Sequence, residues 1–435
     1  MESTPAWKLI ARFSIPTVII TLVMAVYNMA DIFFIGKTGD ANMVNAISVC
    51  MPIFTIVQAF GTLVGTGGCT AISLALGKNE SDRTKTISSF CFWFCIGLGL
   101  LLTLIMNIFA DGFMRMLGAA DSYYNFAVTY LRIIACGCPV MLFSNAFVNI
   151  LRADGSIKES MGANLSGTFF NIILDPILIL KFNMGVAGAA IATVLGNVLV
   201  MIIVALVIRK KKHLLSVNPK SVSLKPENSF RILVLGFPVA SGTLLVSAAY
   251  MIINHLLKAY DVNAQGAFGI CRTIMLLSTM IQMGICMGTQ PAISYNFGRG
   301  NMHKTKELIL KTGIVSVTFG AILAAVVLLL RGNILPAFLD DPAVLVYADR
   351  ILIGCLCTAA VYGLYETCAA ALQALEQPLL STITTLLRQG IVLIPMMLIL
   401  NTLFGYSGLI FCFAVSDVIA AAVGLTFTIR CLSKK

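Results

Sequence analysis

The sequence has 435 residues, of which 58% are hydrophobic and 11% are charged, and its mean hydropathy is +0.93. Soluble domains are rarely more than about half apolar, so this composition excludes a soluble protein and indicates a chain embedded in a membrane. The formal net charge of +11 is compatible with nucleic-acid binding, but the positions of the basic residues favour membrane topology as its cause.

Twelve apolar segments follow one another along the chain. Each is long enough to cross a bilayer as a helix, which takes about 20 residues. The segments are residues 9–36, 46–76, 87–111, 124–150, 160–180, 185–208, 230–257, 265–296, 307–331, 343–373, 378–401 and 404–430. We therefore predict an all-α membrane protein with twelve transmembrane helices.

The basic residues are distributed unequally between alternate connections. With the N-terminus in the cytoplasm, the inside segments hold 21 of the 30 Lys and Arg residues and the outside loops hold six. Positive charge is enriched on the cytoplasmic side of membrane proteins. The sequence thus predicts a multi-pass protein of the cytoplasmic (inner) membrane with both termini in the cytoplasm.

The two halves of the chain repeat each other. Residues 71–85 and 292–306 are identical at six of fifteen positions, and nearly the same offset relates Pro16 to Pro238 and Gly67 to Gly288. We predict two pseudosymmetric six-helix bundles, residues 1–208 and 230–435, joined by a cytoplasmic linker, residues 209–229. Two parallel repeats around a central cavity are typical of alternating-access transporters.

The fifth apolar segment contains Asn171 and Asp175 one helical turn apart, followed by Pro176. Proline removes a backbone donor and should bend the helix. A carboxylate at this depth costs on the order of 3 kcal/mol, which usually reflects a function. We predict that Asp175 binds and releases a cation during transport; a protonated Asp with structural hydrogen bonds is the alternative.

A second acid lies within the first apolar segment, at Asp31. Two carboxylates that meet in a dry pocket cannot both ionise cheaply, so they share a proton or bind a cation, unless Asp31 is a solvated charge at a helix end. The small-residue run around Ala189 exposes backbone carbonyls, and Thr193 could add a hydroxyl oxygen. Such hard oxygen ligands suit Na⁺, and we predict a possible Na⁺ site at Asp31, Asn171, Asp175 and Thr193. Tyr130 is a further polar candidate, or a packing residue.

The second half does not repeat this site, because its positions equivalent to Asp31 and Asp175 are near Ile253 and Met396. It has intramembrane acids of its own, Glu366 and Asp417, for which a substrate contact and structural hydrogen bonding both stay open. Polar or soft side chains are expected to line a substrate cavity between the halves. They are Met24, Gln58, Thr62, Tyr250, Asn254, Gln282, Met283 and Met287, with Tyr362 and Glu366.

The sequence resembles the multidrug and toxic compound extrusion (MATE) family over essentially its whole length. The matching motifs are Pro16 with residues 27–36, residues 151–155, residues 171–176 with 185–193, and residues 290–298. The resemblance implies two six-helix bundles that export organic cations in exchange for Na⁺ or H⁺. By similarity to the DinF-like and MepA-like branches, Asp31, Asn171, Asp175 and Thr193 match the first-bundle cation site. Tyr27 and Tyr130 match tyrosines around it.

We expect a cation-coupled antiporter for multidrug efflux, with organic cations or amphipathic drugs as substrates, acting as a monomer. No cofactor is expected other than the coupling ion, which the sequence leaves open between Na⁺ and H⁺. The alternative is a flippase for lipid-linked saccharides, which would need cavity arginines; the candidates are Arg132, Arg272 and Arg388. An enzyme is not expected, because the sequence has no paired His/Glu motif, Ser/His set or intramembrane Asp dyad.

Overall fold

The computed structural model describes residues 4–210, 214–222, 229–260, 262–338 and 342–433. These residues form helices and no strands. In chain order the helices are α1 (Ala6–Gly36), α2 (Ala41–Gly77), α3 (Ser81–Ile108), α4 (Ala110–Met116), α5 (Tyr124–Ala153), α6 (Ile157–Asp175), η1 (Pro176–Lys181), α7 (Gly185–Lys210), η2 (Pro219–Ser221), α8 (Ser229–Tyr260), α9 (Val262–Gly298), α10 (Met302–Phe338), α11 (Pro342–Leu356), α12 (Ala359–Ala374), α13 (Pro378–Leu386), η3 (Leu387–Ile391), α14 (Leu393–Phe404) and α15 (Tyr406–Ser433).

Within the described residues, eleven helices are long and apolar enough to cross a membrane, and α11 with α12 make a twelfth span. This confirms the predicted all-α fold with twelve transmembrane segments. The segment predicted as one span over 343–373 is in fact two helices that meet at 43°. The bend lies at Cys357 and Thr358, between the end of α11 and the start of α12, three residues after Gly354.

Two further breaks occur inside spans, and both are π-helical. The α-helical pattern of α6 ends at Asp175, and the wider turns of η1 begin at Pro176. The second π-helical segment, η3, carries Arg388 and lies between α13 and α14. Such insertions are rare in helices and are frequent at functional sites.

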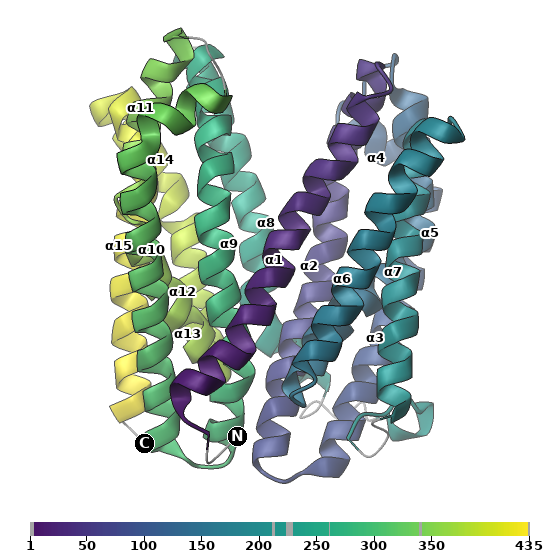
Figure 1. Ribbon diagram of the computed structural model, residues 1–435, viewed down its shortest axis with the longest axis vertical. Helices are drawn as coiled ribbons and strands as arrows, with labels where there is room; N and C mark the ends of the chain where they lie inside the picture. Colours follow the sequence, from purple (N-terminus) through teal and green to yellow (C-terminus); the bar gives the residue numbers. More distant parts are fainter. Residues whose placement is uncertain (1–3, 211–213, 223–228, 261, 339–341, 434–435) are drawn as a thin grey trace. The chain divides into compact units, whose positions relative to one another are not determined.

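The chain forms two compact units (Figure 1). The first-half unit contains residues 19–236, and the second-half unit contains residues 1–18 and 237–435. The beginning of α1 therefore belongs with the second half of the chain, and the beginning of α8 with the first. The start of α1 and the end of α15 lie at the same end of the second-half unit (Figure 1).

Close glycine contacts explain this exchange of helix starts. A Cβ atom on Gly67 of α2 would collide with the carbonyl oxygen of Ile232 in α8. Likewise, a Cβ atom on Gly236 of α8 would collide with the carbonyl oxygen of Leu63 in α2. The first turns of α8 are therefore in direct backbone contact with α2. In the other unit Gly288 of α9 makes the equivalent close contact with the backbone of Phe13. Gly67 and Gly288 are the pair related by the sequence repeat, which is why the same exchange occurs twice.

Part of the polar linker is fixed against α3 in the first-half unit. The carbonyl oxygen of Ser216 accepts hydrogen bonds from the hydroxyls of Ser88 at 2.9 Å and Ser89 at 3.0 Å. The indole of Trp93 donates to the carbonyl of Val217 at 3.2 Å. The basic run therefore leads into a segment that is held on the helical bundle.

Candidate functional site

The predicted ion site centres on α6, where Asn171 is 2% exposed and Asp175 is fully buried. Their positions at i and i+4 put them on the same face of the helix, as the sequence predicted. Pro176 follows directly and starts η1. Where the regular hydrogen bonding of a helix is interrupted, backbone carbonyl oxygens lose their helical partners. Together with the Asp175 carboxylate, such carbonyls can offer several oxygen ligands to a cation.

Helix α7 packs closely and antiparallel against this face of α6. A Cβ atom on Gly196 would lie 2.9 Å from the carbonyl oxygen of Gly167 and 3.2 Å from Cβ of Asn171. Towards the start of α7, a Cβ atom on Gly188 would lie 2.9 Å from the carbonyl carbon of Leu178. Asp175 is therefore at the level of the part of α7 between these two glycines.

That part of α7 contains Ala189 and Thr193, each 2% exposed. The carbonyl oxygen of Thr193 accepts a hydrogen bond from the side-chain amide of Asn197 at 2.9 Å. Tyr130 of α5 is 7% exposed and belongs to the same apolar core as Ala189. The structure thus brings Asn171, Asp175, Ala189 and Thr193 together on two helices in contact, with Tyr130 in the core of the same unit.

The side chain of Asn171 is unusual in this environment. Both its amide oxygen and its amide nitrogen are buried and have no hydrogen-bond partner in the part of the chain that the structure describes. Leaving such a group without a partner costs about 1–3 kcal/mol. A bound ion or its hydration water would compensate this cost, and the amide oxygen is a hard ligand suited to Na⁺.

Two of the predicted coupling residues, Tyr27 and Asp31, have side chains that lie outside the described residues. The same holds for Asn254 among the predicted cavity residues. The proposed meeting of Asp31 with Asp175 therefore stays a prediction.

The other predicted cavity residues of the first half, Met24, Gln58 and Thr62, are half-buried. Gln58 accepts a hydrogen bond from the amide of Asn145 on α5. The amide of Asn149, one turn further along α5, donates to the carbonyl of Asn145 at 2.8 Å. Gln58 is therefore part of a polar row that follows α5 through the first-half unit.

In the second-half unit, Gln282 is buried and its amide donates to the hydroxyl of Ser278 at 3.1 Å. It packs where Gly320 of α10 and Gly363 of α12 come close to α9. Met283 and Met287, on the same helix, are half-buried. Gln282 thus lies among three helices inside its own unit.

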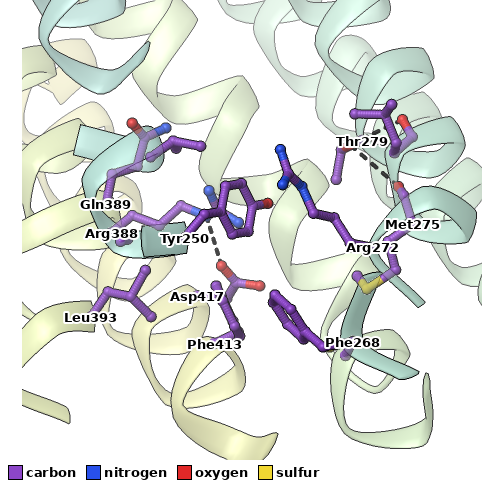
Figure 2. A pocket seen from close by; sticks show the side chains of 14 residues that line it. Tyr250, Phe268, Arg272, Met275, Thr279, Arg388, Gln389, Leu393, Phe413 and Asp417 are labelled. Atoms are coloured by element: carbon purple, nitrogen blue, oxygen red, sulfur yellow. Dashed lines mark hydrogen bonds and ion pairs between the residues drawn. The ribbon is translucent and has the colours of Figure 1, made fainter. Parts of the chain in front are cut away.

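The second-half unit also contains a cavity that leaves about 80 Å³ for the centres of water-sized molecules, enough for several waters (Figure 2). Of the predicted cavity residues, Tyr250 lines it. Its full lining is Val246, Ala249, Tyr250, Phe268, Arg272, Met275, Leu276, Thr279, Cys355, Arg388, Gln389, Leu393, Phe413 and Asp417.

An ion pair crosses one wall of this cavity. The Nε atom of Arg388 lies 2.7 Å from Oδ1 of Asp417, and the hydroxyl of Thr358 donates to Oδ2 of Asp417 at 3.0 Å. The guanidinium of Arg388 also lies over the rings of Tyr362, at 4.5 Å, and Tyr365, at 5.1 Å. The charge of Arg388 is thus paired with Asp417, and its guanidinium packs against Tyr362 and Tyr365. Glu366, one turn after Tyr362, is half-buried.

Arg272 and Arg388 were named from the sequence only as candidate cavity arginines of the alternative flippase; both lie within the predicted spans, 265–296 and 378–401. Placing an arginine inside the bilayer costs free energy, so an arginine in a span usually faces protein or a water-filled cavity. Their position within spans was therefore the sequence feature that could have placed Arg272 and Arg388 in a cavity. Arg132 is exposed, as Arg272 is, but it pairs with Asp111 at 3.5 Å.

The family model for MatE matches residues 16–177 and 238–399, which covers one copy of the repeat in each half. The chain therefore belongs to the MatE family of multi-pass membrane transporters. It is 31% identical over 427 residues to the multidrug export protein MepA of Staphylococcus aureus strain MRSA252, covering 98% of this chain and 94% of the relative. It is also 31% identical over 432 residues to the MepA protein of Staphylococcus haemolyticus strain JCSC1435, covering 99% and 95%.

The fold agrees with solved structures of the family. A MATE crystal structure in the straight conformation superposes with a TM-score of 0.93 over 99% of this chain and 98% of the other, at 22% sequence identity. The two-bundle architecture predicted from the repeat is thus the architecture of known MATE transporters.

Proposed function

We propose that this protein is a multidrug exporter that couples the outward movement of organic cations to the inward movement of Na⁺ or H⁺. Two relatives of nearly the same length are named multidrug export proteins. The observation that carries the ion coupling is the fully buried carboxyl of Asp175 beside the buried amide of Asn171. A buried charge of this kind needs a cation or a proton, and ion binding can therefore change the energy of the bundle.

The mechanism is reciprocal. An ion that enters from outside neutralises the region around Asp175 and Asp31 and lowers the affinity for the exported compound; the inward-facing state returns the ion. Such coupling is a linkage free energy between two sites, typically about 1–3 kcal/mol. Thr193 and Asn171 supply neutral oxygens, Tyr27 and Tyr130 surround the site, and the protein acts as a monomer in the cytoplasmic membrane with both ends in the cytoplasm.

The test is the accumulation of ethidium in inside-out vesicles, driven first by an imposed pH gradient and then by an imposed Na⁺ gradient. We expect accumulation with at least one gradient and its loss in Asp175→Asn. Asp121→Asn, which changes an exposed acid outside the helices, is the matched control and should transport as the wild type does. Absence of accumulation under both gradients, or wild-type transport by Asp175→Asn, would contradict the proposal.

A further inference from the structure

One positive charge in the cavity of the second-half unit has no acidic partner. Three charged residues line this cavity, and Arg388 is neutralised by Asp417 at 2.7 Å. Arg272 makes no ion pair and no side-chain hydrogen bond within the described residues; its guanidinium carbon lies 4.0 Å from the centre of the Tyr250 ring. The cavity therefore has an excess of one positive charge, on Arg272.

The stacking of Arg272 leaves its hydrogen-bonding capacity intact. A guanidinium carries five N–H donors, all in its own plane, and stacking on an aromatic ring uses only the face of that plane. The edge can still bind a carboxylate through two parallel hydrogen bonds. Figure 2 shows the side chains of Arg272, Tyr250 and Asp417 converging on the same region.

The rest of the lining suits an aromatic compound. The rings of Phe268 and Phe413 are stacked, with centroids 6.1 Å apart and planes 18° apart, and the Tyr250 ring lies 6.3 Å from the first and 6.4 Å from the second. Aromatic walls with a few polar groups are typical of small-molecule sites.

We propose that this cavity binds amphipathic aromatic compounds through an anionic group, a carboxylate held by the edge of Arg272, with their rings against Tyr250, Phe268 and Phe413. The site would let the exporter accept anionic drugs in addition to cations, and only this last step rests on the proposed export function. Arg388 does not bind the carboxylate of the ligand, because its charge is already paired with that of Asp417.

The test is equilibrium dialysis of radiolabelled 1-naphthoate against the full-length protein in dodecyl maltoside, with empty micelles as the blank. The uncharged 1-naphthamide, which has nearly the same shape, measures binding without the anion. We expect naphthoate to bind the wild type about tenfold or more tightly than naphthamide, the difference made by a charge-assisted hydrogen-bond pair. Arg272→Gln should remove this preference, and Arg272→Lys should keep part of it.

Arg132→Gln is the matched control, because Arg132 also lies within a span but pairs with Asp111 in the other unit. It should bind both compounds as the wild type does. Equal binding of the two compounds by the wild type, or an unchanged preference in Arg272→Gln, would overturn the proposal. So would displacement of naphthoate by phosphatidylglycerol but not by phosphatidylcholine, which would assign the site to a lipid headgroup. No ion gradient is used, so this test and the ethidium assay can fail independently.

Discussion

The Nε atom of Arg388 lies 2.7 Å from Oδ1 of Asp417, and this contact joins the π-helical segment η3 to α15. Both side chains are largely buried, with exposures of 16% and 8%. The pair is also the point at which the α13–η3–α14 span is attached to the last helix, since the hydroxyl of Ser416 donates to the carbonyl of Arg388 at 2.6 Å.

Replacing only one member of this pair should destabilise the protein. Asp417→Asn leaves the Arg388 charge without its partner, which typically costs about 3–5 kcal/mol for a buried pair. Arg388→Met combined with Asp417→Leu removes both charges and should recover most of the loss. Thermal unfolding in detergent, followed by size-exclusion chromatography, measures both variants. An Asp417→Asn protein as stable as the wild type would show that the pair contributes nothing to stability.

The close backbone contacts of α2 and α8 give a prediction about glycine. Gly67→Ala and Gly236→Ala each force a methyl group into a neighbouring carbonyl, so each should lower stability by about 1–3 kcal/mol. Gly97→Ala is the matched control, because a Cβ atom there meets nothing within 4 Å. It should be neutral or stabilising by up to about 1 kcal/mol, since alanine favours a helix interior. Equal thermal stability of the three variants would contradict the contacts.

A substitution at Asn171 can distinguish a role in ion binding from a role in stability. Asn171→Leu removes a buried amide that has no hydrogen-bond partner among the described residues, so the unfolding temperature should stay the same or rise. Efflux should instead require a higher concentration of the coupling ion, by about tenfold or more if the amide oxygen is a ligand. Ethidium transport is measured against Na⁺ concentration and pH. A large fall in stability with unchanged ion dependence would assign Asn171 a structural role.

The attachment of the linker can be tested by proteolysis. Ser88→Ala combined with Ser89→Ala removes both hydrogen bonds to the Ser216 carbonyl, so the segment that follows should open more often. Trypsin should then cut faster after Lys220, which lies four residues further along. Ser48→Ala is the control, because the Ser48 hydroxyl donates to the carbonyl of Val44 in its own helix at 2.8 Å. An unchanged cleavage rate in the double variant would mean that Trp93 alone holds the segment.

The elements that could be predicted from the sequence are those set by local pattern. Apolar length located the spans, and the spacing of Asn171, Asp175 and Pro176 located a buried polar pair at a helix irregularity. Helical periodicity is enough for this, because both residues lie on one helix. The residues placed around them on α7 followed from the small side chains near Ala189, which allow two helices to approach closely.

The remaining features depend on contacts between distant segments. Arg388 and Asp417 are on different helices, and their pairing depends on how each helix is rotated about its axis, which a single sequence does not specify. The same is true of Arg272 on Tyr250. The bend at Cys357 has no proline beside it. The π turns of η3 end at Ile391, four residues before Pro395, whose missing N–H was a local signal that the sequence analysis did not use.

The exchanged helix starts mean that neither half of the gene encodes a complete bundle. A fragment that ends before Ser229 would contain Gly67 and Leu63 but not the turns of α8 that pack on them, and a fragment that begins there would present Gly288 without Phe13. In each case backbone surface that is buried in the full chain would be left open. The two repeats are thus related as partners of a domain-swapped dimer that have been fused into one polypeptide, each copy completing the other.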